Sequence, residues 1–277
     1  MKRRDFLTGS AAAAASGVVW GQRPDQAKLN RIGVMSLVFG SILKNPSIPD
    51  DPKRTLAIMD FPEMLAHRFG VHNVEMQHEH FLSTEPAYFQ EFLERVKKAR
   101  SVVSQINLEF GSLNVSAKEL VRRLETIDLT KRWISHAVAL GCPRVMVNQG
   151  TLDPAVRQSA VETLKTINAY AKMKKVFITF EVRRETWETQ LEVIKAAGIL
   201  PHADCGKFPS EEARVKGLRL IYPNTAGNSH VTGPNIADSV KIAKELGYKG
   251  LFTIEGSRGT DPYTTVKTNM DIVLANM

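Results

Sequence analysis

Residues 176–204 read VFITFEVRRETWETQLEVIKAAGILPHAD, and much of the fold follows from this stretch. It begins with an apolar run, rich in β-branched and aromatic residues, that ends at Glu181, and it closes with a second short apolar run that ends at Asp204. Residues 186–197 between them have the spacing of an amphipathic helix, and Gly198 follows as a plausible C-cap residue. Two strands joined by a helix in this way are typical of a parallel sheet covered by helices.

The same alternation of short apolar runs and longer amphipathic stretches continues on both sides. We predict strands at 32–36, 73–76, 106–110, 144–147, 176–181, 199–204, 228–231 and 250–255. Helices are predicted at 86–105, 129–140, 153–174, 186–197, 211–222, 234–246 and from 261 to the C-terminus, and 38–54 is expected to be a long loop. Because a barrel of eight strands and helices needs about 250 residues, this 277-residue chain is predicted to be an α/β protein with a single-domain (β/α)8 TIM barrel over residues 30–277.

The N-terminus has the features of an export signal. It begins MKRRDFL and continues with a mildly apolar, alanine-rich segment up to Trp20. Paired arginines before such a segment are typical of the twin-arginine route, so we expect residues 1–22 to be a signal and the protein to be periplasmic or extracellular. The segment is shorter than the roughly 20 apolar residues of a membrane-spanning helix, so no membrane contact beyond the signal is expected. The alternative is a disordered basic tail.

Composition narrows the range of partners. Hydrophobic residues make up 43% of the chain and charged residues 24%, which is typical of a globular protein. The net charge of +8 is spread along the chain without a run of five or more Lys or Arg residues. We therefore expect no nucleic-acid partner, since such binding usually needs a concentrated basic patch.

Four consecutive predicted strands each carry one side chain that can bind a metal ion near their C-terminal ends. These side chains are Glu181, Asp204, His230 and Glu255. In a (β/α)8 barrel the C-terminal ends of all strands meet at one face, where functional groups gather. Three carboxylates and one imidazole suit one divalent ion such as Mn²⁺, Mg²⁺, Co²⁺ or Zn²⁺, and a cation would relieve the repulsion among buried carboxylates. Taken singly, each residue also fits an ordinary rim, turn-capping or loop position.

These segments resemble the xylose isomerase-like TIM-barrel family of sugar isomerases and epimerases. The resemblance extends over roughly residues 30–277 and rests on an ordered set of short segments, none of which is specific alone. The segments are Arg132 to Gly150, Phe180-Glu181, Ala203-Asp204-Cys205-Gly206-Lys207-Phe208, Ser229-His230-Val231-Thr232 and Thr253-Ile254-Glu255. The resemblance implies that Glu181, Asp204, His230 and Glu255 bind one divalent metal ion and that the two glutamates flank the substrate carbon.

The sequence departs from the family around these ligands. The family often has Asn and His after the glutamate of the fifth strand, where this chain has Val182 and Arg183. Lys207 stands in place of the Asn of an Asp-x-Gly-Asn segment, and Thr232 stands in place of the Lys of a His-x-Lys segment. The metal ligands are thus kept while the residues around the substrate differ.

The resemblance implies an enzyme, a metal-dependent isomerase or epimerase acting on a small-molecule carbohydrate, either a sugar or a keto-sugar. A metal ion polarises the substrate carbonyl and stabilises an enediolate. Glu181 and Glu255 are the expected catalytic residues, one removing the proton next to the carbonyl and the other returning it. Barrels of this family often associate, so a homo-oligomer is compatible with the sequence.

Further polar residues are candidates for substrate binding. They are Glu75, His78, Asn148, Arg183 and Lys207, which lie at or after predicted strand ends. For each, a structural or solvated position is about as compatible with the sequence. The two histidines of the segment His78-Glu79-His80 are a candidate second metal site.

Three alternatives share the barrel. A lyase or dehydratase acting on an oxidised (3-keto) sugar or glycoside would use the same metal site, because it also begins with proton removal next to a carbonyl. A metal-dependent phosphodiesterase would need more His and Asp ligands than the sequence offers. A non-catalytic sugar-binding barrel would fit the changes at Val182, Lys207 and Thr232.

Overall fold

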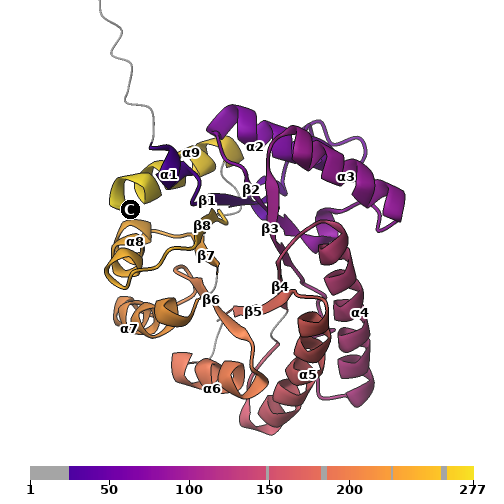
Figure 1. The fold of residues 1–277 in the computed structure, drawn as a ribbon, viewed down its shortest axis with the longest axis vertical. Helices are drawn as coiled ribbons and strands as arrows, with labels where there is room; N and C mark the ends of the chain where they lie inside the picture. Colours follow the sequence, from indigo (N-terminus) through magenta and orange to yellow (C-terminus); the bar gives the residue numbers. More distant parts are fainter. Residues whose placement is uncertain (1–24, 148–149, 182–185, 226, 257–260) are drawn as a thin grey trace, which may run out of the picture.

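The computed structural model is a closed barrel of eight parallel strands in the order β1-β2-β3-β4-β5-β6-β7-β8, surrounded by helices (Figure 1). It describes residues 25–147, 150–181, 186–225, 227–256 and 261–277. The predicted single-domain (β/α)8 barrel is confirmed. The predicted signal, residues 1–22, lies outside the described residues.

The elements have the following bounds. The strands are β1 (Ile32–Met35), β2 (Asn73–Gln77), β3 (Val102–Asn107), β4 (Arg144–Val147), β5 (Phe177–Glu181), β6 (Leu200–Asp204), β7 (Asn228–Val231) and β8 (Leu251–Ile254). The α-helices are α1 (Gln26–Leu29), α2 (Phe61–Phe69), α3 (Pro86–Lys98), α4 (Leu120–Ala139), α5 (Pro154–Met173), α6 (Trp187–Ala197), α7 (Glu211–Ile221), α8 (Ile236–Glu245) and α9 (Pro262–Asn276). Short 3₁₀ helices are η1 (Ser36–Phe39), η2 (Ile58–Asp60), η3 (His78–His80) and η4 (Tyr222–Asn224).

Local sequence signals set the ends of the helix between β5 and β6. The side chain of Thr186 accepts a hydrogen bond from the backbone N–H of Thr189 and caps the N-terminus of α6. Gly198 ends the helix in the left-handed conformation with φ of 66°, which glycine adopts without the steric cost of a Cβ atom. Helix α6 therefore returns the chain to the start of β6, parallel to β5.

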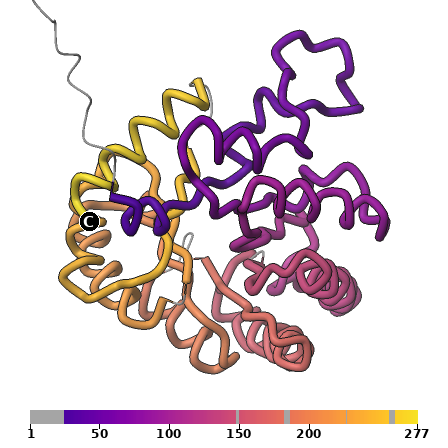
Figure 2. The backbone as a smooth tube through the Cα atoms, turned by 45° about the horizontal axis from the view of Figure 1, so that its top comes forward, coloured from indigo at the N-terminus to yellow at the C-terminus, as the bar shows by residue number. Residues whose placement is uncertain are grey.

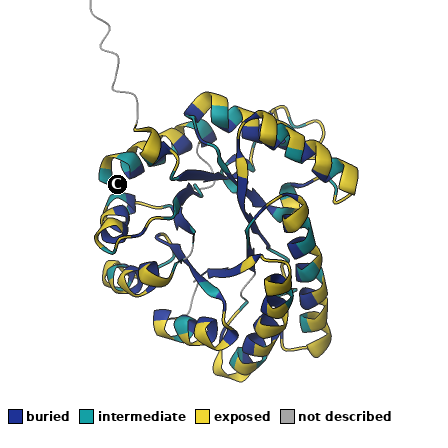
Figure 3. Ribbon diagram, viewed as in Figure 1, coloured by how far each residue is buried: buried dark blue, intermediate teal, exposed yellow. Residues whose placement is uncertain are grey.

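The apolar core lies between the barrel and its helices. Each helix turns its buried side toward the strands and its exposed side toward solvent (Figure 3). Phe180 on β5, Phe252 on β8 and Ile134 on α4 are among the largest fully buried side chains. Burial of such faces is the main source of helix stability in a barrel of this size.

The third strand begins earlier than predicted. It runs from Val102 to Asn107, whereas the sequence pattern favoured a helix as far as residue 105 and a strand at 106–110. Helix α3 ends at Lys98, and Arg100 turns the chain with φ of 53°. The prediction was wrong because Gln105 and Asn107 are polar yet fully buried, so β3 lacks the apolar run by which a buried strand is usually recognised.

The fourth helix is longer than predicted. It begins at Leu120, nine residues before the predicted start at 129. Its first turns expose the apolar residues Leu120, Val121 and Leu124, so they do not show the periodic apolar face that marks a helix.

The segment after β1 is largely a loop, as expected for residues 38–54, and it is tied down at one point by a bridge between Leu43 and Leu56. The two ends of the described chain lie side by side in Figures 1 and 2, where the Lys28 ammonium donates a hydrogen bond to the carbonyl of Leu274 over 3.0 Å. Among the described residues, no helix has both the length and the apolar character needed to cross a membrane.

Candidate metal centre and active site

Four side chains converge inside the C-terminal mouth of the barrel. Glu181 ends β5, Asp204 ends β6, His230 lies on β7 and Glu255 follows β8 directly. Each offers one ligand atom, and these four atoms all lie within 4.8 Å of one another. The structure thus brings together the residues that the sequence predicted as a metal site, because consecutive parallel strands end at the same face.

His230 lies at the centre of this cluster. Its Nδ1 atom is 3.2 Å from Oε1 of Glu181 and 3.8 Å from Oε2 of Glu255. Burial would lower the pKa of His230, but the charge of Glu75 and hydrogen bonds to Glu181 and Glu75 outweigh it, so the pKa is raised well above the ordinary value. These distances show that Nδ1 of this ring faces the carboxylates of Glu181 and Glu255.

The cluster has a deficit of positive charge. Oδ2 of Asp204 and Oε2 of Glu255 are buried and have no hydrogen-bond partner among the described residues. Burial, followed by repulsion from Glu255 and Glu181, raises the pKa of Asp204 well above its usual range. Burial also raises the pKa of Glu255, although His230 opposes the shift. Buried carboxylate oxygens without a hydrogen bond, beside an imidazole, are a donor set that a divalent cation satisfies, so these residues fit a metal ion.

The other oxygen of Asp204 has a local partner. Oδ1 accepts a hydrogen bond from the backbone N–H of Gly206 over 2.7 Å. Asp204 therefore caps the turn after β6 with one oxygen and points the other toward the cluster. The turn-capping position and the metal-ligand position considered from the sequence are thus compatible.

Glu75 lies beneath the cluster and not at the mouth, where substrate contact was predicted. It is fully buried, and its Oε1 atom is 2.6 Å from Nε2 of His230. Gln105, Asn107 and Asn228 donate further hydrogen bonds to its carboxylate. Burial opposes ionisation, but His230, followed by His202 and the hydrogen bond from Asn107, outweighs it and lowers the pKa of Glu75 to about 2.

Contacts of Glu75 pass through the interior of the barrel. Glu75 is on β2 and its partners His230 and Asn228 are on β7, and in the strand order these strands are separated by β1 and β8. A carboxylate that holds the far nitrogen of a ligand histidine fixes the orientation of the ring and its tautomer. The buried position of Glu75 therefore fits a role in orienting His230 better than contact with a substrate.

A second histidine, His202, lies inside the barrel next to the cluster. In the register of β5 and β6 it pairs with Glu181, so both side chains point to the same side of the sheet. It is fully buried, and both ring nitrogens have no hydrogen-bond partner among the residues described. Burial, with a smaller contribution from His230, lowers the pKa of His202 to about 3. An unpartnered buried polar group costs about 1–3 kcal/mol.

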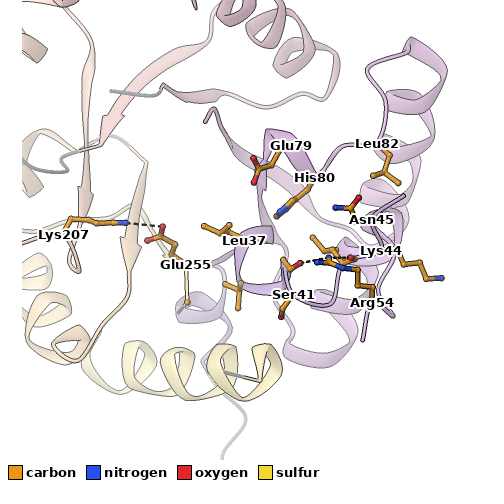
Figure 4. A pocket seen from close by; sticks show the side chains of 14 residues that line it. Leu37, Ser41, Lys44, Asn45, Arg54, Glu79, His80, Leu82, Lys207 and Glu255 are labelled. Carbon is orange, nitrogen blue, oxygen red and sulfur yellow. Dashed lines mark hydrogen bonds and ion pairs between the residues drawn. The ribbon is translucent and has the colours of Figure 1, made fainter. Parts of the chain in front are cut away.

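A cavity of about 720 Å³ extends from the cluster toward the loops after β1 and β2. Figure 4 shows Lys207 and Glu255 at one end and Arg54 at the other, with Leu37 and His80 between them. The lining residues are Leu37, Val38, Gly40, Ser41, Leu43, Lys44, Asn45, Arg54, Glu79, His80, Leu82, Lys207, Glu255 and Gly256. This volume falls in the usual range for sites that bind small molecules.

Lys207 places a positive charge at the edge of the cluster. Its Nζ atom is 3.8 Å from Oδ2 of Asp204 and 3.8 Å from Oε1 of Glu255, and its side chain is 38% exposed. The structure thus puts Lys207 in the cavity wall, next to two of the candidate metal ligands.

The two histidines after β2 have different surroundings. Nδ1 of His78 accepts a hydrogen bond from the backbone N–H of Glu109, and its ring packs against Phe110 and Trp133. Burial lowers its pKa. His78 is thus held by protein groups and does not line the cavity, although substrate contact was predicted for it.

His80, in contrast, lines the cavity. Its Nδ1 atom is 2.8 Å from Oγ of Ser36, and burial, followed by the effect of His78, lowers its pKa to about 4. The candidate second metal site at these two histidines therefore gains no support, because they face different surroundings. Asn148 and Arg183, also predicted to bind substrate, lie outside the described residues.

Sequence reasoning missed the polar floor of the barrel. It consists of His202, Gln105, Asn107 and Asn228, all buried beside the cluster. Gln105 and Asn107 are two residues apart on β3, as are His202 and Asp204 on β6, and as are Asn228 and His230 on β7. Polar residues that alternate along a strand share one face, and this spacing is the signal that could have identified them.

No protein-family model matches the sequence, and no curated protein matches it either. Several solved structures share the fold. A D-allulose 3-epimerase from Methylomonas sp. aligns with a TM-score of 0.71 at 13% identity, covering 89% of this chain and 98% of that one. A xylose isomerase-like TIM barrel protein from Mycobacterium smegmatis in complex with magnesium aligns with a TM-score of 0.65 at 15% identity, covering 90% and 98%.

A third structure, the IOLI protein with a binding zinc atom, aligns with a TM-score of 0.67 at 14% identity, covering 89% of this chain and 99% of that chain. The alignments take in nearly the whole of each solved structure. At these identities they establish a common architecture. The chain therefore shares the eight-stranded barrel fold of xylose isomerase-like proteins.

Proposed function

We propose that this chain is a divalent-metal-dependent enzyme that isomerises or epimerises a sugar or keto-sugar. The observation that carries the proposal is the convergence of Glu181, Asp204, His230 and Glu255, with ligand atoms within 4.8 Å of one another, beside a cavity of about 720 Å³. Solved structures with the same fold include a D-allulose 3-epimerase and an L-ribulose 3-epimerase, which supports this class of reaction.

The four converging residues would hold the metal ion. Three carboxylates and one imidazole suit Mn²⁺, Mg²⁺, Co²⁺ or Zn²⁺, and relatives in fold were solved with magnesium and with zinc. When bound, the ion supplies electrostatic polarisation of a carbonyl and a neighbouring hydroxyl of the substrate.

Glu181 and Glu255 are the proposed acid and base. Both carboxylates border the same space next to Nδ1 of His230, so a substrate carbon lying between them would have a proton acceptor on one side and a donor on the other. Removing a proton from the substrate carbon and returning one changes the configuration of the substrate but leaves its atomic composition unchanged.

The cavity fits a small polar substrate. Its wall combines the apolar side chains of Leu37 and Val38 with polar groups of Ser41, Asn45 and Arg54. Two N–H groups of the Arg54 guanidinium already have structural roles, because Nη1 donates hydrogen bonds to the carbonyls of Gly40 and Leu43. Arg54 therefore shapes this wall, and the hydroxyl of Ser41 and the amide of Asn45 are groups in the lining that can bind substrate hydroxyls.

A lyase acting on an oxidised (3-keto) sugar or glycoside is the second candidate. The observation in its favour is Lys207, whose ammonium lies 3.8 Å from Glu255. An elimination needs a proton donor for the leaving oxygen as well as a base for the carbon, and this pair offers both. An isomerase leaves the mass of its substrate unchanged, whereas a lyase divides or dehydrates it.

The test compares the wild-type protein with the Glu181→Gln/Glu255→Gln double variant. About one equivalent of divalent ion in the wild type, absent from the double variant, is expected. Keto-sugars are then incubated in D₂O, where the wild type is expected to exchange the proton next to the carbonyl and the variant is not. Wild-type protein that neither binds nor is stabilised by any of the four ions would overturn the proposal and favour a sugar-binding barrel.

We also propose that the protein is exported through the twin-arginine route. The proposal rests on Arg3 and Arg4, which precede an alanine-rich segment. Cell fractionation of the full chain against the Arg3→Lys/Arg4→Lys variant tests it, and retention of only the variant in the cytoplasm is the expected result. Equal distribution of the two would refute export by this route.

A further inference from the structure

His202 is a buried histidine on β6 that is not one of the four ligands of the proposed metal centre. Its side chain shares the interior face with Asp204, two residues further along β6, and with Glu181, its register partner on β5. Its ring meets the ring of His230 almost edge to face, with centroids 4.1 Å apart.

Neither ring nitrogen of His202 has a hydrogen-bond partner in the described part of the chain, and the side chain is completely buried. Buried polar groups in proteins nearly always have partners. The phenol of Tyr222, also deeply buried, follows this rule through Oγ of Ser229. The two buried ring nitrogens of His202, which lie next to carboxylates and have no hydrogen-bond partner among the described residues, are therefore available to bind a ligand.

One ring nitrogen of His202, one of His230 and a carboxylate oxygen of Glu181 lie within 4.8 Å of one another. This set shares Glu181 and His230 with the proposed centre. It replaces the two remaining carboxylates, Asp204 and Glu255, by a single imidazole. The barrel thus contains two overlapping ligand sets, an outer one rich in oxygen and an inner one rich in nitrogen.

We propose that Glu181, His202 and His230 form a second, inner metal position that takes a borderline ion such as Zn²⁺ or Co²⁺. Two imidazoles and one carboxylate are a common ligand set for zinc, whereas Mg²⁺ and Mn²⁺ favour carboxylate oxygens. This inference rests on the proposed function in one respect, which is that a divalent ion binds at the shared residues Glu181 and His230.

The shared ligands affect which metal ion can occupy each position. Since Glu181 and His230 belong to both sets, we expect the two positions to compete for one ion, and we expect the kind of ion to determine which position is filled. An ion in the inner position leaves Asp204 and Glu255 without a metal bond. The full chain loaded with zinc is therefore expected to differ in ligand set from the same chain loaded with manganese.

The experiment measures affinities of the purified full chain for Zn²⁺ and Mn²⁺ by competition with a chromophoric chelator. The variants are His202→Asn, which alters only the inner set, and Asp204→Asn, which alters only the outer set. His202→Asn is expected to lower zinc affinity tenfold to a hundredfold and to change manganese affinity less than twofold. Asp204→Asn is expected to lower the affinity for manganese strongly and to change the affinity for zinc little.

X-ray absorption at the zinc edge gives a readout that needs no variant. Two imidazole ligands in the zinc-loaded wild type are expected, and one in His202→Asn. Normal manganese binding by His202→Asn shows that this variant is folded; if it is not folded, His202→Phe and the wild-type spectrum carry the test.

The outcomes separate the two proposals. Binding of manganese that depends on Asp204, together with zinc binding indifferent to His202 and a single imidazole in the spectrum, would overturn the inner position alone. Absence of binding for both ions in the wild type would overturn the inner position and the proposed function together.

Discussion

Replacing Glu75 by glutamine is expected to destabilise the protein and to weaken metal binding, although Glu75 is not a metal ligand in our proposal. Its carboxylate accepts hydrogen bonds from Asn107, Gln105 and Asn228 and holds Nε2 of His230 at 2.6 Å. An amide at this position turns an NH₂ group toward a set of donors and removes the negative charge beside the imidazole.

The magnitude follows from the burial of the pair. Both Glu75 and His230 are fully buried, and removing one partner of a buried charged pair costs about 3–5 kcal/mol. This is a large share of a total stability of about 5–15 kcal/mol. Each kcal/mol lowers Tm by about 2–4 °C in a domain of about 150–250 residues, so a fall on the order of 10 °C is expected.

Metal affinity is expected to fall about tenfold to a hundredfold, which is typical when the partner that orients a ligand histidine is lost. The pKa of His230 should also fall, since the charge of Glu75 is the largest influence that raises it. Proton-detected NMR titration of the metal-free protein measures this shift, and titration with Mn²⁺ measures the affinity.

Glu63→Gln is the matched control. Glu63 pairs with Lys98 at 3.4 Å on the surface, where both side chains are at least half exposed, and such pairs contribute about 0–1 kcal/mol. Urea unfolding of metal-free protein compares the two variants. A Glu75→Gln variant as stable as Glu63→Gln, with unchanged manganese affinity, would refute the reasoning.

Three further outcomes are expected. The pKa values of Asp204 and Glu255 are raised, so in the metal-free protein their contribution to stability is present at low pH and is lost as pH rises through the raised pKa values. A cation binds only the ionised carboxylates, so the rise in Tm on adding Mn²⁺ should be larger at pH 8 than at pH 5, and a shift independent of pH would contradict this. Lys207→Gln removes a half-exposed positive charge 3.8 Å from both carboxylates and should increase manganese affinity several-fold by calorimetry; weaker binding would show that Lys207 supports the site. Gly217→Ala places a Cβ atom on the indole ring of Trp187 and should cost about 1–3 kcal/mol in urea unfolding, whereas unchanged stability would mean that the ring moves aside freely.

Much of the fold could be predicted from local patterns. The apolar runs before Glu181, Asp204 and Glu255, joined by amphipathic stretches that end at glycines, indicate parallel strands with helical connections. Because parallel strands present their C-terminal ends at one face, the order of the residues along the chain was enough to expect their convergence. His230 could be added to them for the same reason, since it lies on the strand between.

The start of β3 and the role of Glu75 could not be predicted in this way. Gln105 and Asn107 make β3 look like a polar segment, and they are tolerated inside the barrel only because Glu75 on the neighbouring strand accepts their hydrogen bonds. The two-residue spacing of Gln105 and Asn107 indicates that their side chains share one face of a strand, but only their hydrogen-bond partners show that this face is buried.

The sequence alone determined the alternation of strands and helices, the closed barrel that it implies and the face at which Glu181, Asp204, His230 and Glu255 gather. Only the tertiary structure decided that Glu75 holds Nε2 of His230, that the ring nitrogens of His202 have no hydrogen-bond partner among the described residues, and that the loop containing Arg54 lines the cavity. The physical reason is distance along the chain. Strand patterns are set by neighbours in sequence, whereas the contact between Glu75 and His230 across the barrel interior joins residues 155 positions apart.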